Sequence, residues 1–368
     1  MRICHVSVLN PVFHSRIYYK WALSQLQSGH EMGIIAQSQI SSTIVPQDID
    51  LMPFPTFSRM GLGRLGTHIR IYRRLRKWKA DLVVIHAPEL LWLVWAMGKR
   101  VNFHYDVHED YQKNILHGKT YPKWIRSVLA SLVRKLEKLA MKRVRTASYA
   151  EACYENVLSL PASRYLILEN KFSSRGIGKP VIQAPFKKYM LYAGTIAEAW
   201  GIWEVLDVWA RLNQQTKVPL VVAGHTHYGE LVKDVLRFVE KNRLQDRFRL
   251  IGGTQYIPYS HIISLMQQAT AVVALYHDLP QIKGKLPTKF FEAMAFQKPL
   301  LFTPMKEWIE CNQAHTIGIP YQREKLSPLE IWDQLQQLEV EVDADLWSWE
   351  EKKLAQFMDQ HYFALSGK

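Results

Sequence analysis

The sequence predicts an α/β protein of two domains, each built around a parallel β-sheet. At 368 residues the chain exceeds what one ordinary hydrophobic core accommodates. Short apolar runs alternate with amphipathic segments along the chain, which is the pattern of strand–helix–strand units. This alternation stops at residues 171–188, where glycine and proline are frequent and apolar residues are few, and it then starts again.

The first series of elements occupies residues 1–170, the expected N-terminal domain. Residues 2–9 are apolar enough for a buried strand, residues 10–15 form a polar loop, and a helix over residues 16–28 ends at Gly29. The remaining elements of this domain are strands at residues 31–36, 82–85 and 165–168, a strand that begins at residue 101, and basic helices near residues 59–79 and 119–145.

The second series occupies residues 189–345, the expected C-terminal domain, after a linker at residues 171–188. Its expected elements are strands at residues 189–193, 219–223, 247–251, 271–275 and 300–303, and helices at residues 201–212, 262–268 and from residue 288. Residues 346–368 then predict a closing helix, continuous over residues 346–362. It is rich in aromatic residues, and we expect it to pack back on the N-terminal domain.

Cysteine usage and hydropathy indicate an intracellular protein. The three cysteines, Cys4, Cys153 and Cys311, are too few and too far apart for a disulfide framework or a CxxC metal site. The most apolar stretch, residues 82–97, is interrupted by His86 and predicts no membrane span. We therefore expect a cytoplasmic location.

Positive charge is concentrated in the first half of the chain. Of the net charge of +14, residues 1–170 supply most, with 24 lysines and arginines against 12 acids. Near residues 59–79 and 119–145 the basic residues alternate with apolar ones, Trp78 and Trp124 among them. Such runs form either ordinary solvated helix faces or a surface for an anionic partner. The sequence carries no zinc-finger or RNP-type signature, which favours anionic lipid over nucleic acid and a peripheral position on the inner face of the cytoplasmic membrane.

Titratable residues gather where the strand beginning at residue 101 ends. Ligands of open parallel sheets bind at the carboxyl ends of strands, so Asp106, His108 and Glu109 are candidate catalytic residues. Their spacing is compatible with metal ligation, but no distant histidine or cysteine partner is marked out by the sequence. We therefore expect no metal.

Residues 285–299 predict a phosphate-binding helix start. Pro287 suits the beginning of a helix, and Thr288 is expected to cap its free amides. Lys283, Lys285 and Lys289 add positive charge where the helix dipole is already positive. The alternative is that Lys289 and Glu292 form an ordinary surface pair three residues apart.

Glycines end several strands of the second series. Gly194, Gly224 and the pair Gly252 and Gly253 each follow an apolar run. In a parallel sheet these ends lie at one edge, together with the start of the helix at residue 288. With the end of the strand at residues 271–275, four strand ends lie at this edge, and they predict a ligand site there.

These stretches resemble those of a known enzyme family. Residues 285–299 are similar to the donor-binding signature of family 4 retaining glycosyltransferases, which have the GT-B architecture of two Rossmann-like domains facing across an interdomain cleft. Three further stretches resemble family motifs in the family's order. They are the loop with His14, Ser15 and Arg16, the strand end at residues 106–111, and the turn at residues 192–195.

The resemblance implies an activity and site roles. The activity is transfer of a hexose from a nucleotide-sugar, with retention and without metal or other cofactor, to a glycan or lipid-linked acceptor in cell-envelope polysaccharide biosynthesis. His108 would lie beside the transferred sugar, and Glu292 would bind the ribose. The full set implied for the donor is Gly194, Thr195, Gly224, Lys283, Lys285, Thr288, Lys289 and Glu292.

Two departures from the family pattern leave alternatives open. Residue 284 is glycine where many members carry glutamate, and the turn after residue 194 lacks the usual arginine and lysine. We expect the lysines before Glu292 to hold the diphosphate instead. The alternatives are a sugar-nucleotide epimerase of similar fold and a non-catalytic scaffold that binds glycans or membranes.

Overall fold

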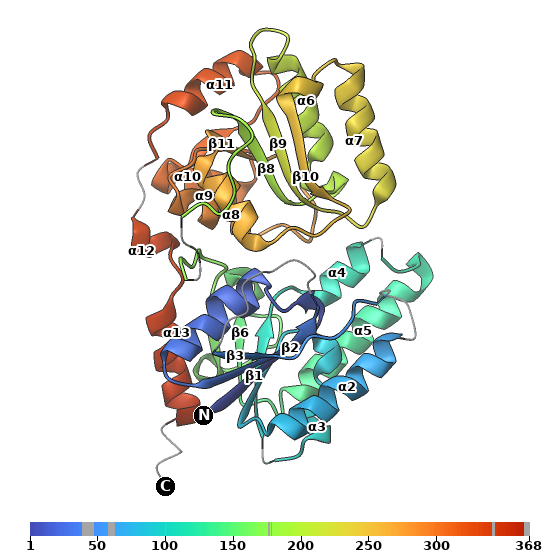
Figure 1. Cartoon of the computed structure of the whole chain (residues 1–368). Coiled ribbons are helices and arrows are strands. Elements are labelled where there is room, and N and C mark those ends of the chain that lie inside the picture. The colour runs from blue at the N-terminus through green and yellow to red at the C-terminus, as the bar shows by residue number, and fades with distance from the viewer. Residues whose placement is uncertain are drawn as a thin grey trace. The chain divides into compact units, whose positions relative to one another are not determined.

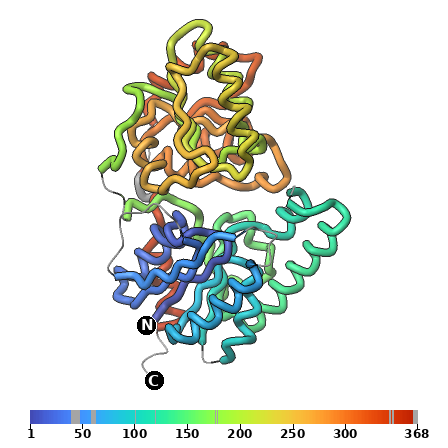
Figure 2. Tube along the Cα trace, turned by 45° about the vertical axis from the view of Figure 1, so that its right-hand side comes forward, coloured from blue at the N-terminus to red at the C-terminus, as the bar shows by residue number. Residues whose placement is uncertain are grey.

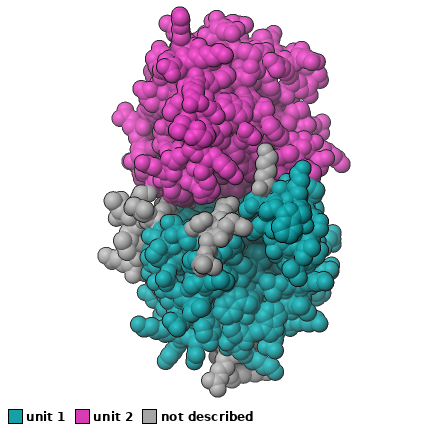
Figure 3. All heavy atoms as spheres, turned by 90° about the vertical axis from the view of Figure 1, so that its right-hand side faces the viewer, with its two compact units in different colours: residues 1–170, 349–368 teal, residues 171–348 magenta. Residues whose placement is uncertain are grey.

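The computed structural model describes residues 1–38, 48–57, 63–99, 101–118, 120–175, 177, 179–340 and 343–363. The chain divides into two compact units (Figure 3), and each contains one parallel sheet (Figure 1). Unit 1 consists of Met1–Asn170 and Trp349–Lys368, and unit 2 of Lys171–Ser348. Arg59, Lys119, Gly176 and Gly178, which belong to the predicted basic helices and linker, lie outside the described residues.

Unit 1 contains a seven-stranded sheet in the order β3-β2-β1-β4-β5-β6-β7, with every neighbouring pair parallel. Its strands are β1 (Arg2–Pro11), β2 (Glu31–Gln37), β3 (Ile49–Leu51), β4 (Leu82–Ile85), β5 (Asn102–Val107), β6 (Thr146–Tyr149) and β7 (Tyr165–Ile167). The strands expected from apolar runs are confirmed. The short β3 and β6 were not predicted, because Asp50, Thr146 and Ser148 interrupt their apolar character.

Helices of unit 1 connect these strands. They are the π-helix η1 (Ser15–Ala22), α1 (Leu23–Gln27), α2 (Gly63–Trp78), the 3-10 turn η2 (Pro88–Leu90), α3 (Leu93–Ala96), α4 (Tyr111–His117), α5 (Lys123–Ala140), and the 3-10 turns η3 (Ala152–Tyr154) and η4 (Ala162–Arg164). The predicted helix at residues 16–28 is confirmed in extent, although its first two turns are π-helical. No helix in the described ranges is long and apolar enough to span a lipid bilayer.

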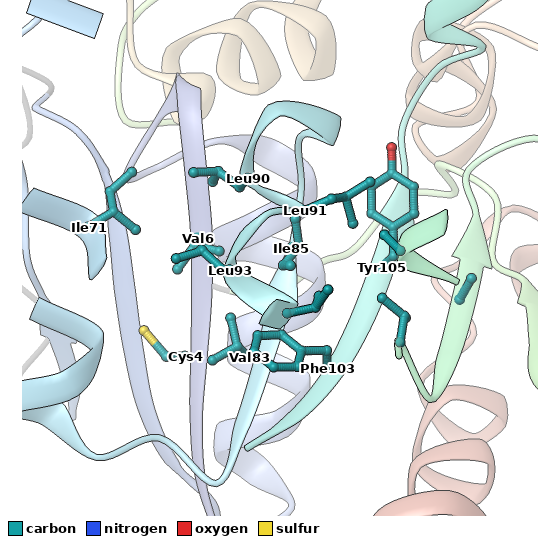
Figure 4. Close-up of a cluster of buried hydrophobic side chains, with 14 of the residues drawn as sticks. Cys4, Val6, Ile71, Val83, Ile85, Leu90, Leu91, Leu93, Phe103 and Tyr105 are labelled. Carbon is teal, nitrogen blue, oxygen red and sulfur yellow. The ribbon is translucent and has the colours of Figure 1, made fainter. Parts of the chain in front are cut away.

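One face of the unit 1 sheet packs an apolar core. Figure 4 shows alternate residues of β1, β4 and β5, such as Val6, Ile85 and Tyr105, meeting Ile71 of α2 and the leucines that follow β4. Successive strand residues point to opposite faces. The other face of β1 and β5 therefore carries polar residues, which are also buried. They are His5, Ser7, His104 and Asp106.

The end of the chain returns to unit 1. It comprises α12 (Ala344–Trp347), α13 (Glu351–Met358) and η7 (Asp359–Phe363), of which the last two lie in unit 1, and Figure 2 shows this segment beside the N-terminal strands. Trp349 Nε1 donates to Ser24 Oγ at 3.1 Å. The prediction of one continuous helix is wrong. Phe172 N donates to the Trp347 carbonyl at 2.8 Å and Phe172 pairs with Ser348, so the backbone there is extended.

Unit 2 contains a six-stranded parallel sheet in the order β10-β9-β8-β11-β12-β13. Its strands are β8 (Met190–Thr195), β9 (Leu220–His225), β10 (Phe248–Gly253), β11 (Ala271–Ala274), β12 (Leu300–Phe302) and β13 (Gly318–Pro320). Its main helices are α6 (Ile202–Leu212), α7 (Gly229–Lys241), α8 (Tyr259–Gln268), α9 (Thr288–Ala295), α10 (Lys306–His315) and α11 (Pro328–Gln337). Apolar clusters cover both sheet faces, which explains why the strands are nearly continuous apolar runs.

The segment predicted as a linker is held against unit 2. Val181 N donates to Ser264 Oγ at 2.8 Å and Ala184 N donates to Gln268 Oε1 at 3.1 Å, so the segment is pinned along α8. Ile182, Ala184 and Phe186 of this segment also pack against an apolar cluster of unit 2.

Candidate functional site

The carboxyl ends of β1, β4 and β5 form the candidate site of unit 1. These strands are neighbours and parallel, so their ends lie at one edge of the sheet. Asp106 is near the end of β5 and His108 follows it, while His86 directly follows β4. Ser15 opens η1, which places Arg16 in its first turn.

A buried ion pair joins η1 to β5. The Arg16 guanidinium donates from Nε to Asp106 Oδ2 and from Nη2 to Oδ1, both at 2.7 Å. The side chains of Arg16 and Asp106 are only 2% and 0% exposed. Burial disfavours the carboxylate, but the charge of Arg16 and the hydrogen bonds from Arg16 and His108 outweigh it and hold the pKa of Asp106 well below its usual range. Asp106 is therefore a fixed negative charge that reaches a ligand only through its neighbours.

Arg16 also ties the end of the N-terminal series to the site. Its Nη1 donates to the Leu168 carbonyl at 2.8 Å and to Asn170 Oδ1 at 3.0 Å. Lys20, one turn later on η1, donates from Nζ to the Asn170 carbonyl at 2.8 Å. These contacts give the predicted loop residues, and the stretch that ends at Asn170, a structural role in addition to any contact with a ligand.

Imidazole rings surround the other side of Asp106. His108 Nε2 lies 2.8 Å from Asp106 Oδ2, and His86 Nδ1 lies 3.1 Å from the same oxygen. The His14 ring lies parallel to that of His108, with ring centroids 5.8 Å apart. Burial lowers the pKa of His86 to about 4 and that of His14 well below its ordinary value, so both rings are neutral near pH 7.

A cavity of about 490 Å³ opens beside these rings. Its polar lining includes Asn10, His14, His86, His108 and Glu109. Apolar side chains of α4 and α5 form another part of its wall, and the Asn114 amide donates to Glu109. Asp110 instead caps α4 and pairs with Arg134 at 2.6 Å, a structural role. The cavity is large enough for a sugar-sized ligand and offers it imidazole, amide and carboxylate groups for hydrogen bonding.

His86, Asp106 and His108 could reach one metal ion, because their ligand atoms lie within 4.8 Å of one another. The Arg16 guanidinium, however, already holds both Asp106 oxygens, and its positive charge would oppose a bound cation. We therefore interpret the three residues as a hydrogen-bonded cluster. That the protein needs neither metal nor cofactor remains a prediction.

Sequence reasoning missed His86. It follows the apolar strand at residues 82–85 directly, so the strand-end rule that selected Asp106 selects it as well. His5 and Gln25, which complete the cluster behind His86, carry no local signal, because they lie within a strand and a helix.

Glycines lie at or next to the carboxyl ends of β8, β9 and β10. A Cβ atom on Gly224 would lie 1.6 Å from the Gly194 carbonyl oxygen, so the backbones of β8 and β9 approach too closely for any side chain. Gly194 itself has φ of 98°, a conformation that favours glycine. A Cβ atom there would lie 3.0 Å from Lys289 Cε, so Lys289 of α9 reaches to the end of β8.

Lys289 is a buried cation at this edge. Its Nζ lies 5.0 Å from the Tyr192 ring centroid and 4.9 Å from that of Tyr276. Burial lowers the pKa of Lys289 to about 7, although the nearby Glu292 raises it. Glu292 is also buried and accepts a hydrogen bond from the Tyr259 hydroxyl at 2.6 Å. The alternative of a surface pair between Lys289 and Glu292 is therefore wrong.

The start of α9 differs from its predicted form. The helix begins at Thr288 as expected, but Pro287 occupies the capping position and supplies no side-chain hydrogen bond. The prediction that Thr288 caps the helix is wrong, because Thr288 is already its first helical residue. The first-turn amides consequently receive no side-chain cap from Pro287, which suits an anion site.

The other candidate residues of unit 2 differ in their contacts and in their burial. Thr195 ends β8, and its carbonyl accepts a hydrogen bond from the Tyr192 hydroxyl at 2.8 Å. The Lys285 carbonyl accepts from Trp308 Nε1 at 2.7 Å. Lys283 is exposed and lies 3.8 Å from Asp278 Oδ1. Of the three lysines, only Lys289 is both buried and next to the glycine edge.

Comparison with known protein families gives a match that lies in unit 2. Residues 180–324 match the family described as glycosyl transferases group 1, a segment that contains the candidate residues of unit 2. No curated protein sequence matches the chain.

Solved structures of glycosyltransferases share the fold over nearly the whole chain. Sucrose-phosphate synthase from Thermosynechococcus elongatus has a TM-score of 0.64 at 12% identity, with 98% of this chain and 94% of that chain covered. WaaG, a glycosyltransferase involved in lipopolysaccharide biosynthesis, has a TM-score of 0.62 at 13% identity, with 100% and 96% covered. HepE from Anabaena, in complex with UDP and glucose, has a TM-score of 0.61 at 13% identity, with 98% and 95% covered. The predicted GT-B architecture is confirmed.

The Arg16–Asp106 pair predicts a large stability effect. Arg16→Met leaves a buried carboxylate without its main partner, so we expect the free energy of unfolding to fall by about 3 to 5 kcal/mol in chemical denaturation. Arg2→Met is the matched control. Its partner Glu31 is solvent-exposed, and we expect a loss below about 1 kcal/mol. Similar losses in the two variants would contradict a special role for the buried pair.

Proposed function

We propose that this protein is a retaining, metal-independent family 4 glycosyltransferase that moves a hexose from a nucleotide-sugar to a glycan or lipid-linked acceptor in cell-envelope polysaccharide biosynthesis. One observation carries the proposal. A buried lysine, an amide-rich helix start and a bare glycine edge meet in the segment that matches the glycosyl transferase family. This combination suits a diphosphate.

Unit 2 would bind the donor nucleotide. Lys289 lies against Gly194 with a lowered pKa, so an arriving diphosphate would restore its full charge and gain a charge-assisted contact. Backbone amides of the first turn of α9 would add neutral donors. Glu292, oriented by the Tyr259 hydroxyl, would accept hydrogen bonds from the two ribose hydroxyls.

Unit 1 would bind the acceptor and act on the transferred sugar. In the reaction, the bond from the anomeric carbon to the diphosphate oxygen breaks and a bond to the acceptor oxygen forms on the same face. The acceptor proton passes to the leaving phosphate oxygen. His108 would hydrogen-bond a sugar hydroxyl, and Asp106 and Glu109 would orient the groups around it.

UDP is the first nucleotide to test, because HepE was solved with UDP and glucose. WaaG acts in lipopolysaccharide biosynthesis, which supports an acceptor of the cell envelope. The basic helices of unit 1 support a membrane-bound acceptor as well, since they offer a surface for anionic lipid.

The outer face of α5 carries apolar residues among lysines. Trp124 is 83% exposed, Val128 63% and Leu132 57%, at helical spacing along one face. Lys135 and Lys138 are exposed on the same helix. Tryptophan and lysine together suit the interface of an anionic bilayer, with the apolar face inserted and the ammonium groups at the headgroups. We therefore place the protein peripherally on the inner face of the cytoplasmic membrane.

The donor site predicts a mutational and a pH effect. Lys289→Met removes a charge-assisted contact, and we expect calorimetry to show UDP-glucose affinity weakened by about 1.5 to 3 kcal/mol. Anion binding raises the pKa of Lys289 above its free value of about 7, so binding takes up a proton. In the unsubstituted protein the affinity is then highest below pH 7 and falls above it, by up to about tenfold per pH unit.

Lys298→Met is the matched control for this experiment. Lys298 is a partly buried lysine just beyond α9, and its pKa is also lowered by burial. We expect this variant to keep both the affinity and its pH dependence. Unchanged affinity in Lys289→Met, or an affinity that does not vary between pH 6 and pH 9 in the unsubstituted protein, would count against the proposed role of Lys289.

Incubation with donor alone separates transfer from the epimerase alternative. We expect no isomerised sugar nucleotide and a release of UDP that depends on added acceptor, both followed by liquid chromatography. An isomerised donor would support the epimerase. Failure to bind any of the UDP-, GDP-, ADP- and CMP-sugars in a thermal-shift screen would support the scaffold.

The membrane surface predicts a lipid-dependent effect. The double variant Trp124→Ser, Leu132→Ser is expected to co-sediment less with anionic vesicles, because the apolar face no longer inserts. Leu236→Ser, on the exposed face of α7 in unit 2, is the control and should bind as the unsubstituted protein does. Equal binding of the unsubstituted protein to neutral and anionic vesicles at low salt would contradict the proposal.

A further inference from the structure

A row of buried polar side chains leads from His108 into the interior of unit 1. His5 of β1 and His86 are both buried, and Gln25 of α1 lies beyond them. Burying such a row lowers the stability of the fold unless its polar atoms have hydrogen-bond partners. The partners in this row are the other members of the row.

The contacts form one continuous chain. Gln25 Oε1 lies 2.7 Å from His5 Nε2, His5 Nδ1 lies 2.8 Å from His86 Nε2, and His86 Nδ1 lies 2.9 Å from His108 Nε2. Both nitrogens of His5 and of His86 are therefore engaged. The Nδ1 atom of His108 is the ring nitrogen left for a ligand in the cavity that His108 lines.

The inner rings of this chain are neutral. Burial lowers the pKa of His5 to about 3 and that of His86 to about 4. A neutral imidazole has one donor and one acceptor nitrogen. With His86 and His108 bonded to each other, the direction of the hydrogen bond at one end of the row therefore fixes the direction of every bond along it.

We propose that His86 and His5 are positioning residues that set, through this chain, which nitrogen of His108 carries the proton, and that they keep Nδ1 of His108 as a hydrogen-bond acceptor for a hydroxyl group in the cavity. Only the identity of that hydroxyl, on a sugar donor or its acceptor, rests on the proposed function.

The direction of the chain follows from its two ends. With the Gln25 oxygen facing His5, the protons lie on Nε2 of His5, of His86 and of His108, and Nδ1 of His108 is bare. With the Gln25 amide reversed, each of the three protons lies on Nδ1 instead, and the net charge is unchanged. The two arrangements differ by the movement of one proton across each ring, so His108 changes from an acceptor to a donor toward the cavity.

Asp106 favours the first arrangement. His108 Nε2 is 2.8 Å from Asp106 Oδ2, whereas His86 Nδ1 is 3.1 Å away. In the first arrangement His108 donates across the shorter contact. In each arrangement one ring nitrogen turns a lone pair toward the carboxylate. In the first it is His86 Nδ1, at 3.1 Å, and in the second it is His108 Nε2, at the shorter and more repulsive distance of 2.8 Å. Gln25 favours neither arrangement. In the first arrangement its Nε2 atom is buried without a hydrogen-bond partner, and in the second its Oε1 atom would be the one without a partner.

Nitrogen-15 NMR of the histidine rings in the full-length protein tests this inference. We expect His108 to carry its proton on Nε2. In the first arrangement, His5→Leu and Gln25→Met each leave a buried ring N–H without an acceptor, whereas in the second arrangement they leave only an unprotonated ring nitrogen. We therefore expect the ratio of the two His108 tautomers to move toward Nδ1–H by roughly fivefold, the effect of one neutral hydrogen bond. A His108 signal unchanged in both folded variants, or a wild-type His108 protonated on Nδ1, would overturn the proposal.

His104→Gln is the matched control. His104 is equally buried on the same sheet face, but it bonds Thr146 and Ser148 and lies outside the row. Its substitution should leave the His108 tautomer unchanged, and a shift as large as in His5→Leu would overturn the proposal as well.

Kinetics supply a second readout. We expect kcat to fall roughly fivefold to tenfold in His5→Leu and Gln25→Met, with KM for the donor unchanged. Unchanged kcat with an altered tautomer would show that Nδ1 does not serve the reaction, and it would overturn the functional part of the inference. Absence of transfer in the unsubstituted protein would refute the proposed function alone, because the NMR readout needs no turnover.

Discussion

The buried pair between Arg16 and Asp106 is the contact on which the site of unit 1 depends. It joins η1, the end of β5 and the backbone near Asn170, three segments that are far apart in the sequence. A buried carboxylate with an unpaired charge would be unfavourable, and a bidentate guanidinium offsets that penalty while fixing the direction of both oxygens. The Oδ2 atom then lies within hydrogen-bonding distance of two imidazoles, so the pair also determines the geometry around the cavity.

The buried charged residue of unit 2, Lys289, differs from Asp106 in how its charge is stabilised. Lys289 has two aromatic rings and the glycine edge around its ammonium group, and burial weakens its hold on a proton. Asp106 is fully charged because its partner is part of the protein. Lys289, in our proposal, becomes fully charged only when an anionic ligand supplies the partner. A site built this way gives up folding stability for binding, since the cation is buried in the free protein too.

Besides the charged Asp106 and Lys289, neutral histidines contribute to the protein's candidate sites. Near pH 7 the buried rings of His5 and His86 contribute no charge, and their value lies in directionality. A row of neutral imidazoles transmits which end is a donor and which an acceptor without moving net charge through the core.

The sequence by itself determined the strands that are apolar runs, the basic helices and the strand ends that carry Asp106, His108, Gly194 and Gly224, because apolar periodicity and the strand-end rule are local. It also placed the start of α9 near Thr288, where the helix begins. Only the tertiary structure decided that Lys289 and Glu292 are buried, that the closing helix breaks at residue 348, and that His5 and His86, 81 residues apart, share a hydrogen bond. Those facts depend on β1 lying beside β4 and on α9 packing against the sheet. Such contacts between distant segments leave no trace in the spacing of residues along the chain.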